Sequence, residues 1–373
     1  MRLLIPDDPP ESAELLQLIT RSCEKQDFPV YIVGGYVRDL ILGRAVSDFD
    51  IVIEGDAIRT GKRLVQEYGG KLTSYPPFGT AKWILPQDVT GLNPERGEID
   101  LVSARKETYP APAALPVVSL SDMKDDLFRR DFSVNALALR LDGSHKGEVL
   151  DLYRGREDIA NGLIRVLHDR SFEDDPTRMF RAVRFEKRLS FMIEPETLAQ
   201  LSRSLKWLKD VSGPRITHEL RLIRKEKECF AVLDRLDALG VLRSVHPVLE
   251  GCGDPASWFG RLTKEALDSL SSRLQLSANA QKTLWGAAFL EQNPPRGKPS
   301  EITLLFEKVP ESSLEIFERI HPEQSGNIRM FREVWHGIRS PIDGRELIAR
   351  GMTPGPEIAD AIQRARCEAI DGN

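Results

Sequence analysis

Two aspartates separated by one residue, Asp48 and Asp50, lie just downstream of the glycine-containing segment Gly34–Asp39. The apolar run Val30–Val33 before the glycines predicts a buried strand, and residues 36–42 predict a helix. A strand, a Gly-Gly turn and a helix start present backbone N–H groups to an anion. Because alternate residues of a strand share a face, both carboxylates can reach one metal site. A phosphate cradle beside paired carboxylates favours Mg²⁺-assisted transfer of a nucleotidyl group.

A third metal ligand is expected, because two carboxylates rarely suffice for a site with two Mg²⁺ ions. Asp100, within the segment Gly97–Val102, is the best candidate, since it lies on a separate apolar strand. As a metal ligand it would help to deprotonate an attacking 3′-hydroxyl. The alternative interpretation is an ordinary surface aspartate on a strand.

The segment Asp126–Ala136 carries a second group of polar side chains. Arg130 can neutralise triphosphate charge. Asp131 and Asn135 are four residues apart and share a face if this stretch is helical. A carboxylate beside an amide suits the hydroxyls of a ribose, although an ion pair with a helix cap would use the same residues.

A third group begins at Asp175, where Arg178, Arg181 and Arg184 follow at intervals of three residues. Asp175 lies three residues before Arg178 and so shares its helical face. A carboxylate acceptor beside an arginine donor can recognise the base edge of cytosine or adenine, which both present an amino group. A mismatched base would cost about 1–3 kcal/mol per contact. The alternative is that Asp175 caps the helix, with Pro176 in its first turn.

The composition is that of an ordinary folded protein, with 41% hydrophobic residues, 29% charged residues and a net charge of −5 over 373 residues. This length allows two or three domains. No apolar run approaches the roughly 18 residues of a membrane span, and the first residues are no signal peptide. The four cysteines lack metal-type spacing, which suits a reducing compartment. We therefore expect a cytoplasmic protein without membrane contact.

Two kinds of periodicity divide the chain into an α/β part and a helical part. Residues 29–140 are mixed, with a helix at residues 57–68, and the prolines of Ala111–Pro116 predict a loop. After Asp151, apolar residues recur at spacings of three and four, which predicts helices. The sequence therefore predicts an α+β chain, in which an α/β catalytic head precedes an all-helical body. Strands are expected at residues 30–33, 50–53, 80–85, 98–103 and 136–141, and further helices at 11–25, 176–189, 196–205, 215–225, 230–239 and 261–274.

The chain resembles class II tRNA nucleotidyltransferases, the bacterial CCA-adding and poly(A) polymerase family within the DNA polymerase β superfamily. The resemblance rests on Gly34–Asp39 with Asp48 and Asp50, on Arg129–Ala136, and on the Asp-x-x-Arg that begins at Asp175. It implies a nucleotidyltransferase head with a five-stranded mixed sheet, a helical neck that recognises the base, a helical body and a helical tail. The expected boundaries are 1–150, 151–210, 211–340 and 341–373.

The resemblance also implies an activity and a set of site residues. The activity would be template-independent, Mg²⁺-dependent addition of CMP, AMP or both to the 3′ end of tRNA, with release of diphosphate. CTP and ATP would be the substrates, and no protein partner is implied. By position, phosphates would contact Gly34, Gly35 and Arg38, Mg²⁺ would bind Asp48, Asp50 and Asp100, and the nucleotide pocket would hold Arg130, Asp131, Asn135, Asp175, Arg178, Arg181 and Arg184.

Several alternatives stay open at this point. Complete CCA addition, CC-only addition, A-only addition and poly(A) synthesis share these motifs, and a small-molecule nucleotidyltransferase could use the same glycines and aspartates. Residues 104–117 would match the family's flexible loop, which lets a pocket switch from CTP to ATP, but they are unusually apolar apart from Arg105. The family commonly has Glu-Asp where this chain has Asp174 and Asp175. Oligomeric state, the tRNA contacts of body and tail, and the role of Gly351–Pro356 are not predicted.

Overall fold

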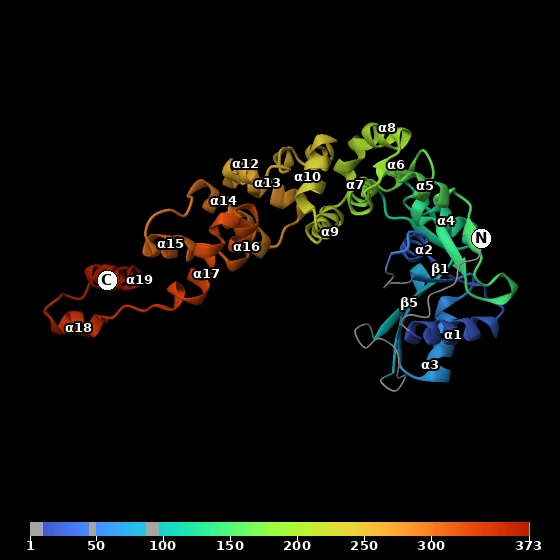
Figure 1. Cartoon of the computed structure of the whole chain (residues 1–373), viewed down its shortest axis with the longest axis horizontal. Helices are drawn as coiled ribbons and strands as arrows, with labels where there is room; N and C mark the ends of the chain where they lie inside the picture. Colours follow the sequence, from blue (N-terminus) through green and yellow to red (C-terminus); the bar gives the residue numbers. More distant parts are fainter. Residues whose placement is uncertain (1–9, 45–49, 87–96, 373) are drawn as a thin grey trace. The chain divides into compact units, whose positions relative to one another are not determined.

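The computed structural model describes residues 10–44, 50–86 and 97–372. The chain forms two compact units, Met1–Val211 and Ser212–Asn373 (Figure 1). The first unit contains a β-sheet with helices around it, and the second is helical throughout. The α+β class predicted from the sequence is therefore confirmed, with the sheet confined to the N-terminal part. The boundaries expected at residues 150, 210 and 340 remain predictions.

The sheet of the first unit has seven strands, where five were predicted. Their order is β3-β4-β5-β2-β1-β8-β9, and only β2 and β5 pair in parallel among these neighbours. The two additional strands lie at the two edges. β3 is largely exposed and polar, and β9 has three residues, so neither shows the apolar pattern of a strand. The strands are β1 Val30–Val33, β2 Asp50–Ile53, β3 Lys71–Tyr75, β4 Thr80–Ile84, β5 Glu98–Ser103, β8 Leu137–Arg140 and β9 Val149–Asp151.

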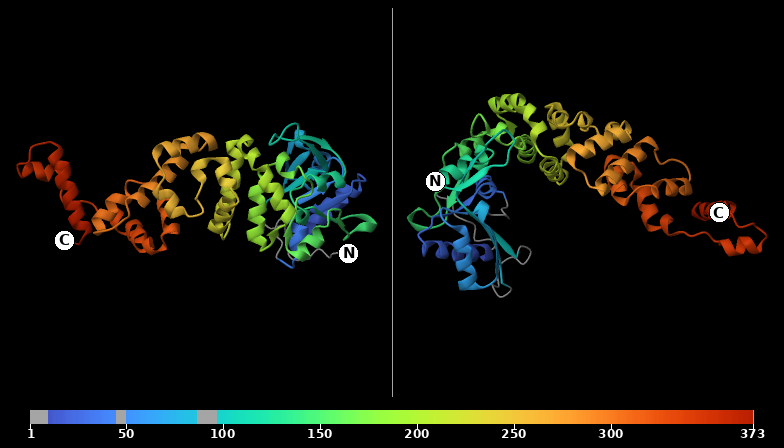
Figure 2. Two further views of the ribbon diagram at one scale, coloured as in Figure 1. Left: turned by 90° about the horizontal axis from the view of Figure 1, so that it is seen from above. Right: turned by 180° about the vertical axis from the view of Figure 1, so that it is seen from behind.

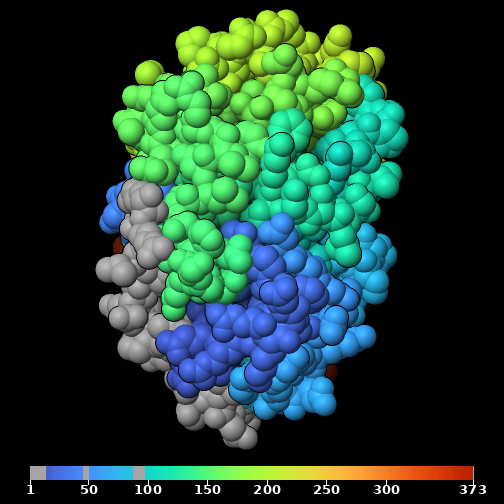
Figure 3. All heavy atoms as spheres, turned by 90° about the vertical axis from the view of Figure 1, so that its right-hand side faces the viewer, coloured from blue at the N-terminus to red at the C-terminus, as the bar shows by residue number. Residues whose placement is uncertain are grey.

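One face of the sheet is covered by α3 (Ala57–Tyr68), on which α1 (Pro10–Glu24) packs. The helix α3 begins where the Asp56 carboxylate accepts a hydrogen bond from the Arg59 backbone N–H at 2.9 Å. Trp83 and Leu101 are fully buried beneath it. Figure 3 shows this side of the unit, with the dark blue N-terminal helix beside the lighter blue segment that follows it. The burial of this face fixes which strand residues point to the opposite, functional side.

The opposite face is partly covered by α4 (Met123–Phe128), and α4 contacts β6 (Arg105–Thr108), which forms a hairpin with β7 (Val117–Leu120). Tyr31, Val52 and Leu127 belong to the apolar cluster on this side. The segment 104–117 was predicted to match a flexible loop, but it contains the strand β6. The predicted loop Ala111–Pro116 is the connection between the two strands.

Short helices and turns lead from the sheet to the end of the first unit. A two-stranded parallel sheet, β10 (Leu163–Ile164) with β11 (Met192–Ile193), lies among them. These elements carry six of the thirteen predicted site residues, so they complete the site that the sheet begins. They are η1 Pro76–Phe78, α2 Gly35–Ile41, η2 Ser133–Asn135, η3 Gly143–His145, α5 Gly155–Asn161, α6 Ser171–Asp174, α7 Arg178–Leu189, α8 Pro195–Ser204 and η4 Leu205–Asp210.

The second unit consists of helices, as Figure 2 shows. An apolar core in its later part includes Phe306, Phe317 and Phe331. No helix in the described part of the chain is long and apolar enough to cross a membrane. The helices are α9 Gly213–Arg224, α10 Cys229–Ala238, α11 Val241–Val245, η5 Pro247–Leu249, α12 Pro255–Gly260, α13 Lys264–Leu274, α14 Ala278–Gln292, α15 Pro299–Phe306, α16 Glu311–Ile320, η6 Pro322–Gln324, α17 Ser325–Glu333, η7 Trp335–Gly337, α18 Gly344–Ala349 and α19 Pro356–Ile370.

Candidate nucleotide-binding site

A pocket of about 410 Å³ opens in the first unit where the end of β1, the start of β2, the β6–β7 hairpin and α7 meet. Ten of the thirteen predicted site residues line it, and five further lining residues were not predicted. The predicted ones are Gly34, Gly35, Arg38, Asp50, Arg130, Asp131, Asn135, Asp175, Arg178 and Arg181, and the others are Glu107, Tyr109, Arg129, Phe185 and Arg188. Segments more than a hundred residues apart in the chain thus form one site.

The turn at Gly34 brings a head arginine against the backbone. Gly34 has φ 73°, a left-handed conformation that a side chain makes costly. Its N–H donates to the Leu137 carbonyl at 3.0 Å, which ties the turn to β8. A Cβ atom at this position would lie 3.0 Å from Nη1 of Arg130. The glycine therefore allows Arg130 to lie directly beside the start of α2.

Arg38 on α2 is fixed by two side chains. Its Nη1 donates to Oδ1 of Asn135 at 2.6 Å, while its Nε and Nη2 donate to the Asp39 carboxylate at 2.9 and 2.8 Å. Asn135 in turn donates to Oδ1 of Asp131 at 3.0 Å. Residues 133–135 form one 3₁₀ turn and no longer helix, yet Asp131 and Asn135 lie side by side as predicted.

Asp131 carries its charge in a nearly buried position, with 8% of its side chain exposed. Nη2 of Arg181 lies 2.6 Å from its Oδ2. Burial alone would raise the pKa of Asp131, but the charge of Arg181 and the hydrogen bond from Asn135 outweigh it and lower the pKa. The carboxylate therefore stays ionised and holds Arg181 at the pocket.

A second buried carboxylate, Asp126, anchors the two neighbouring arginines. Arg129 donates to its Oδ1 at 2.8 Å and Arg130 to its Oδ2 at 3.0 Å. The side chain of Asp126 is fully buried, which would raise its pKa, yet Arg130 and Arg129 lower it. Two guanidinium groups are thus fixed at the pocket wall by a residue that does not line the pocket.

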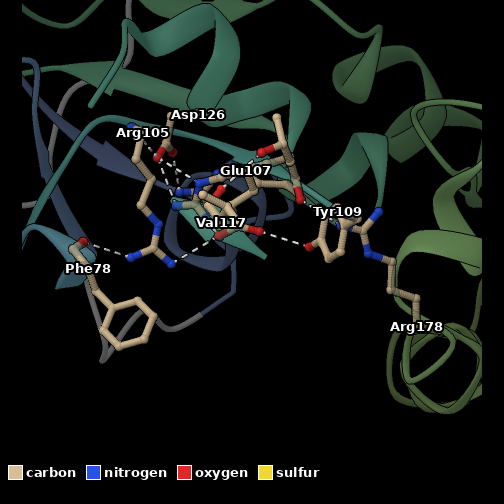
Figure 4. A network of polar contacts seen from close by, with 10 residues as sticks. Phe78, Arg105, Glu107, Tyr109, Val117, Asp126 and Arg178 are labelled. Carbon is tan, nitrogen blue, oxygen red and sulfur yellow. Dashed lines mark hydrogen bonds and ion pairs between the residues drawn. The ribbon is translucent and has the colours of Figure 1, made fainter. Parts of the chain in front are cut away.

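The β6–β7 hairpin is joined to this wall through Glu107 (Figure 4). Oε1 of Glu107 accepts from Arg105 at 3.1 Å and from Arg129 at 3.2 Å, and Oε2 accepts from the Tyr109 hydroxyl at 2.9 Å. Burial, and then the charge of Glu107, raise the pKa of Tyr109, so this phenol remains a hydrogen-bond donor. Arg105 also donates to the Phe78 carbonyl at 3.1 Å. The hairpin is therefore held to its neighbours through Arg105 and Glu107 of β6.

The arginine stripe of α7 divides between the pocket and the core. Arg178 and Arg181 line the pocket, whereas Arg184 is buried and does not. Arg178 donates to Oγ of Ser171 and to the carbonyl of Arg129, both at 2.7 Å. Its orientation is therefore fixed by α6 and by the head.

Phe185 lines the pocket with its aromatic ring and was not predicted from the sequence. The guanidinium carbons of Arg38, Arg181 and Arg188 lie 5.4, 5.6 and 5.7 Å from the centre of its ring. Such cation–π contacts are attractive where water is excluded. Arg188 extends the stripe seven residues beyond Arg181, so the helical spacing could have identified it.

Asp175 lies at the turn between α6 and α7. Its Oδ1 accepts hydrogen bonds from the backbone N–H of Thr177, at 3.0 Å, and from the Thr177 hydroxyl. The residue at the helix N-cap is Thr177. The interpretation of Asp175 as the N-cap is therefore wrong, because α7 begins two residues later than that interpretation requires. The Asp175 carboxylate instead stabilises the turn before α7, and it also lines the pocket, as Arg178 does.

The predicted metal ligands lie at the start of β2 and on β5. Asp50 lines the pocket, and Asp48 falls outside the described residues. Ile51 pairs with Leu101 in parallel, so Asp50 and Asp100, one residue earlier, are neighbours on one sheet face. The Asp100 side chain is 62% exposed, with Nζ of Lys82 at 3.8 Å. Among described residues no three potential ligands cluster, but two neighbouring carboxylates suit a hard divalent cation.

The chain is similar to known protein families and to characterised relatives. Residues 30–165 match the poly(A) polymerase head domain, and residues 190–252 match the probable RNA and SrmB-binding site of polymerase A. The A-adding tRNA nucleotidyltransferase of Halalkalibacterium halodurans is 31% identical over 96% of this chain and 88% of its own length. The chain belongs to the tRNA nucleotidyltransferase family. It is therefore an enzyme of the nucleotidyltransferase type.

Other members of the family show the same similarity over nearly the whole chain. The CC-adding tRNA nucleotidyltransferase of Deinococcus radiodurans is 33% identical over 90% of this chain and 83% of its own. The structure of the Thermotoga maritima CCA-adding enzyme complexed with tRNA is 28% identical, covers 98% of this chain and 92% of that one, and has a TM-score of 0.75. These relatives differ in the nucleotides they are named for, so this tRNA nucleotidyltransferase needs its own assignment of specificity.

Proposed function

We propose that this tRNA nucleotidyltransferase adds the terminal AMP to the 3′ end of tRNA, using ATP and releasing diphosphate. The observation that carries the proposal is the single pocket lined by Asp50, by a group of arginines, and by Asp175 together with Arg178. An A-adding relative and a CCA-adding structure, both similar over nearly the whole chain, support addition of the adenylate. Addition of the preceding CMP residues is the second candidate, since the CC-adding relative is as similar.

The reaction joins the 3′-hydroxyl of the RNA to the α-phosphorus of ATP, breaks the α–β phosphoanhydride bond and transfers the hydroxyl proton to solvent. The triphosphate carries several negative charges, which Arg38 and Arg130 are placed to neutralise. Arg38 is already oriented by Asn135 and Asp39, so little side-chain freedom is lost when phosphate binds. Mg²⁺ held by Asp48, Asp50 and Asp100 would stabilise the charge that develops on the phosphate oxygens.

The base is proposed to be selected by Asp175 and Arg178. A carboxylate accepts from the amino group of adenine or cytosine, and an arginine donates to a neighbouring ring acceptor. Arg178 is fixed by Ser171 and the Arg129 carbonyl. A base that places a carbonyl against Asp175 would leave polar groups mismatched, at a cost of about 1–3 kcal/mol per contact.

The hairpin gives a physical route to the choice between ATP and CTP. Tyr109 and Glu107 line the same pocket as Arg178 and belong to the hairpin network. A shift of the hairpin would move both side chains and change the space left for the base. We propose that the position of Tyr109 and Glu107 determines whether the pocket accepts CTP, if the enzyme also adds CMP. A tRNA substrate also implies a cytoplasmic location, which remains a proposal.

The decisive experiment extends three tRNA transcripts, ending before CCA, after the first C and after CC, each with ATP, CTP or both. Addition of one AMP to the CC-ended transcript is the expected result. Growth of the shortest transcript to CCA with both nucleotides would extend the function to complete synthesis. Incorporation of CMP alone would contradict AMP addition, and no incorporation on any transcript would favour a small-molecule nucleotidyltransferase.

A further inference from the structure

A second depression, outside the nucleotide pocket, lies on the helical unit. It has a volume of about 510 Å³ and lies between α14 and the segment that joins α15 to α16. Three side chains of α14 enter it at helical spacings of three and four residues: Lys282, Trp285 and Phe289. We call this depression the Trp285 groove; Gly286, Glu307, Lys308, Val309 and Pro310 complete its lining.

Trp285 on α14 lies outside the buried face of this helix and is exposed to solvent. The buried face of this helix is formed by small and aliphatic residues, Gly286, Ala287, Ala288 and Leu290. Trp285 is 38% exposed and is the most exposed of the five tryptophans, three of which are at most 9% exposed. A Cβ atom on Gly286 would come within 2.3 Å of Oγ of Ser313. Close approach of α16 thus builds the wall and leaves the indole at the surface.

The charged residues that line the groove are two lysines and one glutamate. Nζ of Lys308 lies 6.0 Å from the centre of the Phe289 ring, and Lys282 is exposed one helical turn before Trp285. The acid of the groove, Glu307, is compensated by Arg366, with contacts of 2.6 and 3.1 Å, and by His336 at 3.4 Å. The hydrogen bond from Arg366 lowers the pKa of Glu307, so it is an ionised but paired group. The two lysines therefore set the sign of the groove.

We propose that the Trp285 groove binds RNA, with the indole stacked on an exposed base of tRNA and Lys282 and Lys308 on the adjacent phosphates. An aromatic ring flanked by cations is the usual arrangement for an unpaired nucleotide, and the wall contributes apolar contact. The groove lies beyond residues 190–252, which match the RNA-binding family model. The identity of the RNA rests on the proposed function.

The test uses the full-length enzyme and a tRNA transcript that ends in CC. Acrylamide quenching of tryptophan fluorescence is expected to fall when tRNA binds, because the most exposed tryptophan becomes covered. Trp285→Ala is expected to weaken tRNA binding, measured by filter retention, by about tenfold, since one base stack contributes on this scale. Trp285→Phe keeps a ring and is expected to restore most of the affinity, and Lys282→Ala with Lys308→Ala is expected to reduce the salt dependence of binding.

The matched control is Met330→Ala, which removes a large side chain of similar exposure, 37%, from α17 of the same unit. It is expected to bind tRNA like the wild type. The groove assignment would be overturned if Trp285→Ala binds tRNA as tightly as the wild type and if tRNA leaves the quenching of the wild type unchanged. The proposed function would still stand, provided that the wild type extends tRNA. Protection of Trp285 that rises with protein concentration in the absence of RNA would also overturn the groove assignment, in favour of a second copy of the chain. If the wild type extends no tRNA, the proposed function fails first.

Discussion

Nη2 of Arg181, on α7, lies 2.6 Å from Oδ2 of Asp131, which follows the two arginines of the head. The pair joins the helix that carries the arginine stripe to the segment that carries Asn135. Its carboxylate is nearly buried and its guanidinium is 34% exposed, so solvent screens the interaction only in part. The contact therefore fixes the distance between two walls of the nucleotide pocket.

We predict that Asp131 and Arg181 are energetically coupled. A double-mutant cycle with Asp131→Asn and Arg181→Gln should give a coupling of about 1–3 kcal/mol, because removal of one partner leaves the other charge poorly compensated. Urea unfolding followed by circular dichroism measures it. The exposed pair Glu196–Arg203, at 63% and 64% exposure, is the control and should give less than about 1 kcal/mol. Equal coupling in both pairs would contradict the prediction.

Gly34, the glycine of the turn after β1, should contribute to tight binding of ATP. Gly34→Ala introduces a side chain at φ 73° and within 3.0 Å of Arg130, and backbone strain of this kind costs about 1–3 kcal/mol. We expect the KM for ATP to rise by about tenfold. Gly43→Ala is the matched control, because Gly43 also has a positive φ, 65°, but its Cβ would meet no atom within 4 Å. A similar rise in KM in both variants would assign the effect to strain alone.

Removal of the Asp50 carboxylate should nearly abolish catalysis, while nucleotide binding should persist. Asp50→Asn is expected to lower kcat by about 10³-fold or more, since charge stabilisation by a bound metal is worth several kcal/mol. Equilibrium binding of ATP, held by the arginines, should change by only a few fold. Addition of EDTA to the wild type should have the same effect, and Mg²⁺ should restore activity. Undiminished turnover in Asp50→Asn would remove this residue from the reaction.

Glu107 should control the position of the hairpin. Glu107→Gln weakens the hydrogen bonds from Arg105, Arg129 and Tyr109, which are charge-assisted in the wild type. We expect faster amide hydrogen exchange over β6 and β7 and a change in the ratio of ATP to CTP use. Glu98→Gln, which alters an exposed pair with Lys82 on the seven-stranded sheet, is the control. Unchanged exchange across the hairpin in Glu107→Gln would show that the network does not hold it.

His168 should make folding sensitive to mild acid. Burial, and then the charges of Arg178 and Arg170, lower the pKa of His168 from 6.5 to about 4. The unfolded chain therefore binds a proton in this range that the folded chain excludes, and stability falls as pH falls from about 6.5 to about 4. Because His168 is only partly buried, screening by solvent should keep the loss below the roughly 3 kcal/mol that the full shift would give. His168→Phe, which can keep the ring contact with Phe128, should lack this component when urea unfolding is measured against pH.

The regular elements were predictable where burial imposes a pattern. The helix Ala57–Tyr68 and the strand Val30–Val33 were predicted with the bounds that the structure shows. The edge strand β3 was missed because its residues are exposed and polar and lack a buried face. The hairpin was missed because proline-rich residues at its tip indicate a loop, while its strands are stabilised by contacts with distant residues such as Asp126.

The site shows the same division between local and distant signals. Gly34, Arg38 and Asp50 follow from a short motif, since one turn and one strand place them together. Glu107 has no such local pattern, because its contact with Arg129 spans 22 residues. Arg184 was predicted for the pocket because it continues the stripe by three, but α7 turns this residue toward the core. A three-residue interval drifts around a helix of 3.6 residues per turn, so the stripe cannot keep one direction.

The anchoring of Arg129 and Arg130 by Asp126 has a consequence for how this enzyme can change over time. One buried side chain fixes two pocket cations, and it also accepts from the backbone N–H of Arg105 at the base of the hairpin at 3.4 Å. A substitution there would disturb the phosphate side and the base side of the pocket together, without touching a substrate. Nucleotide choice in this enzyme is therefore expected to diverge through residues such as Tyr109, whose replacement leaves that shared anchor intact.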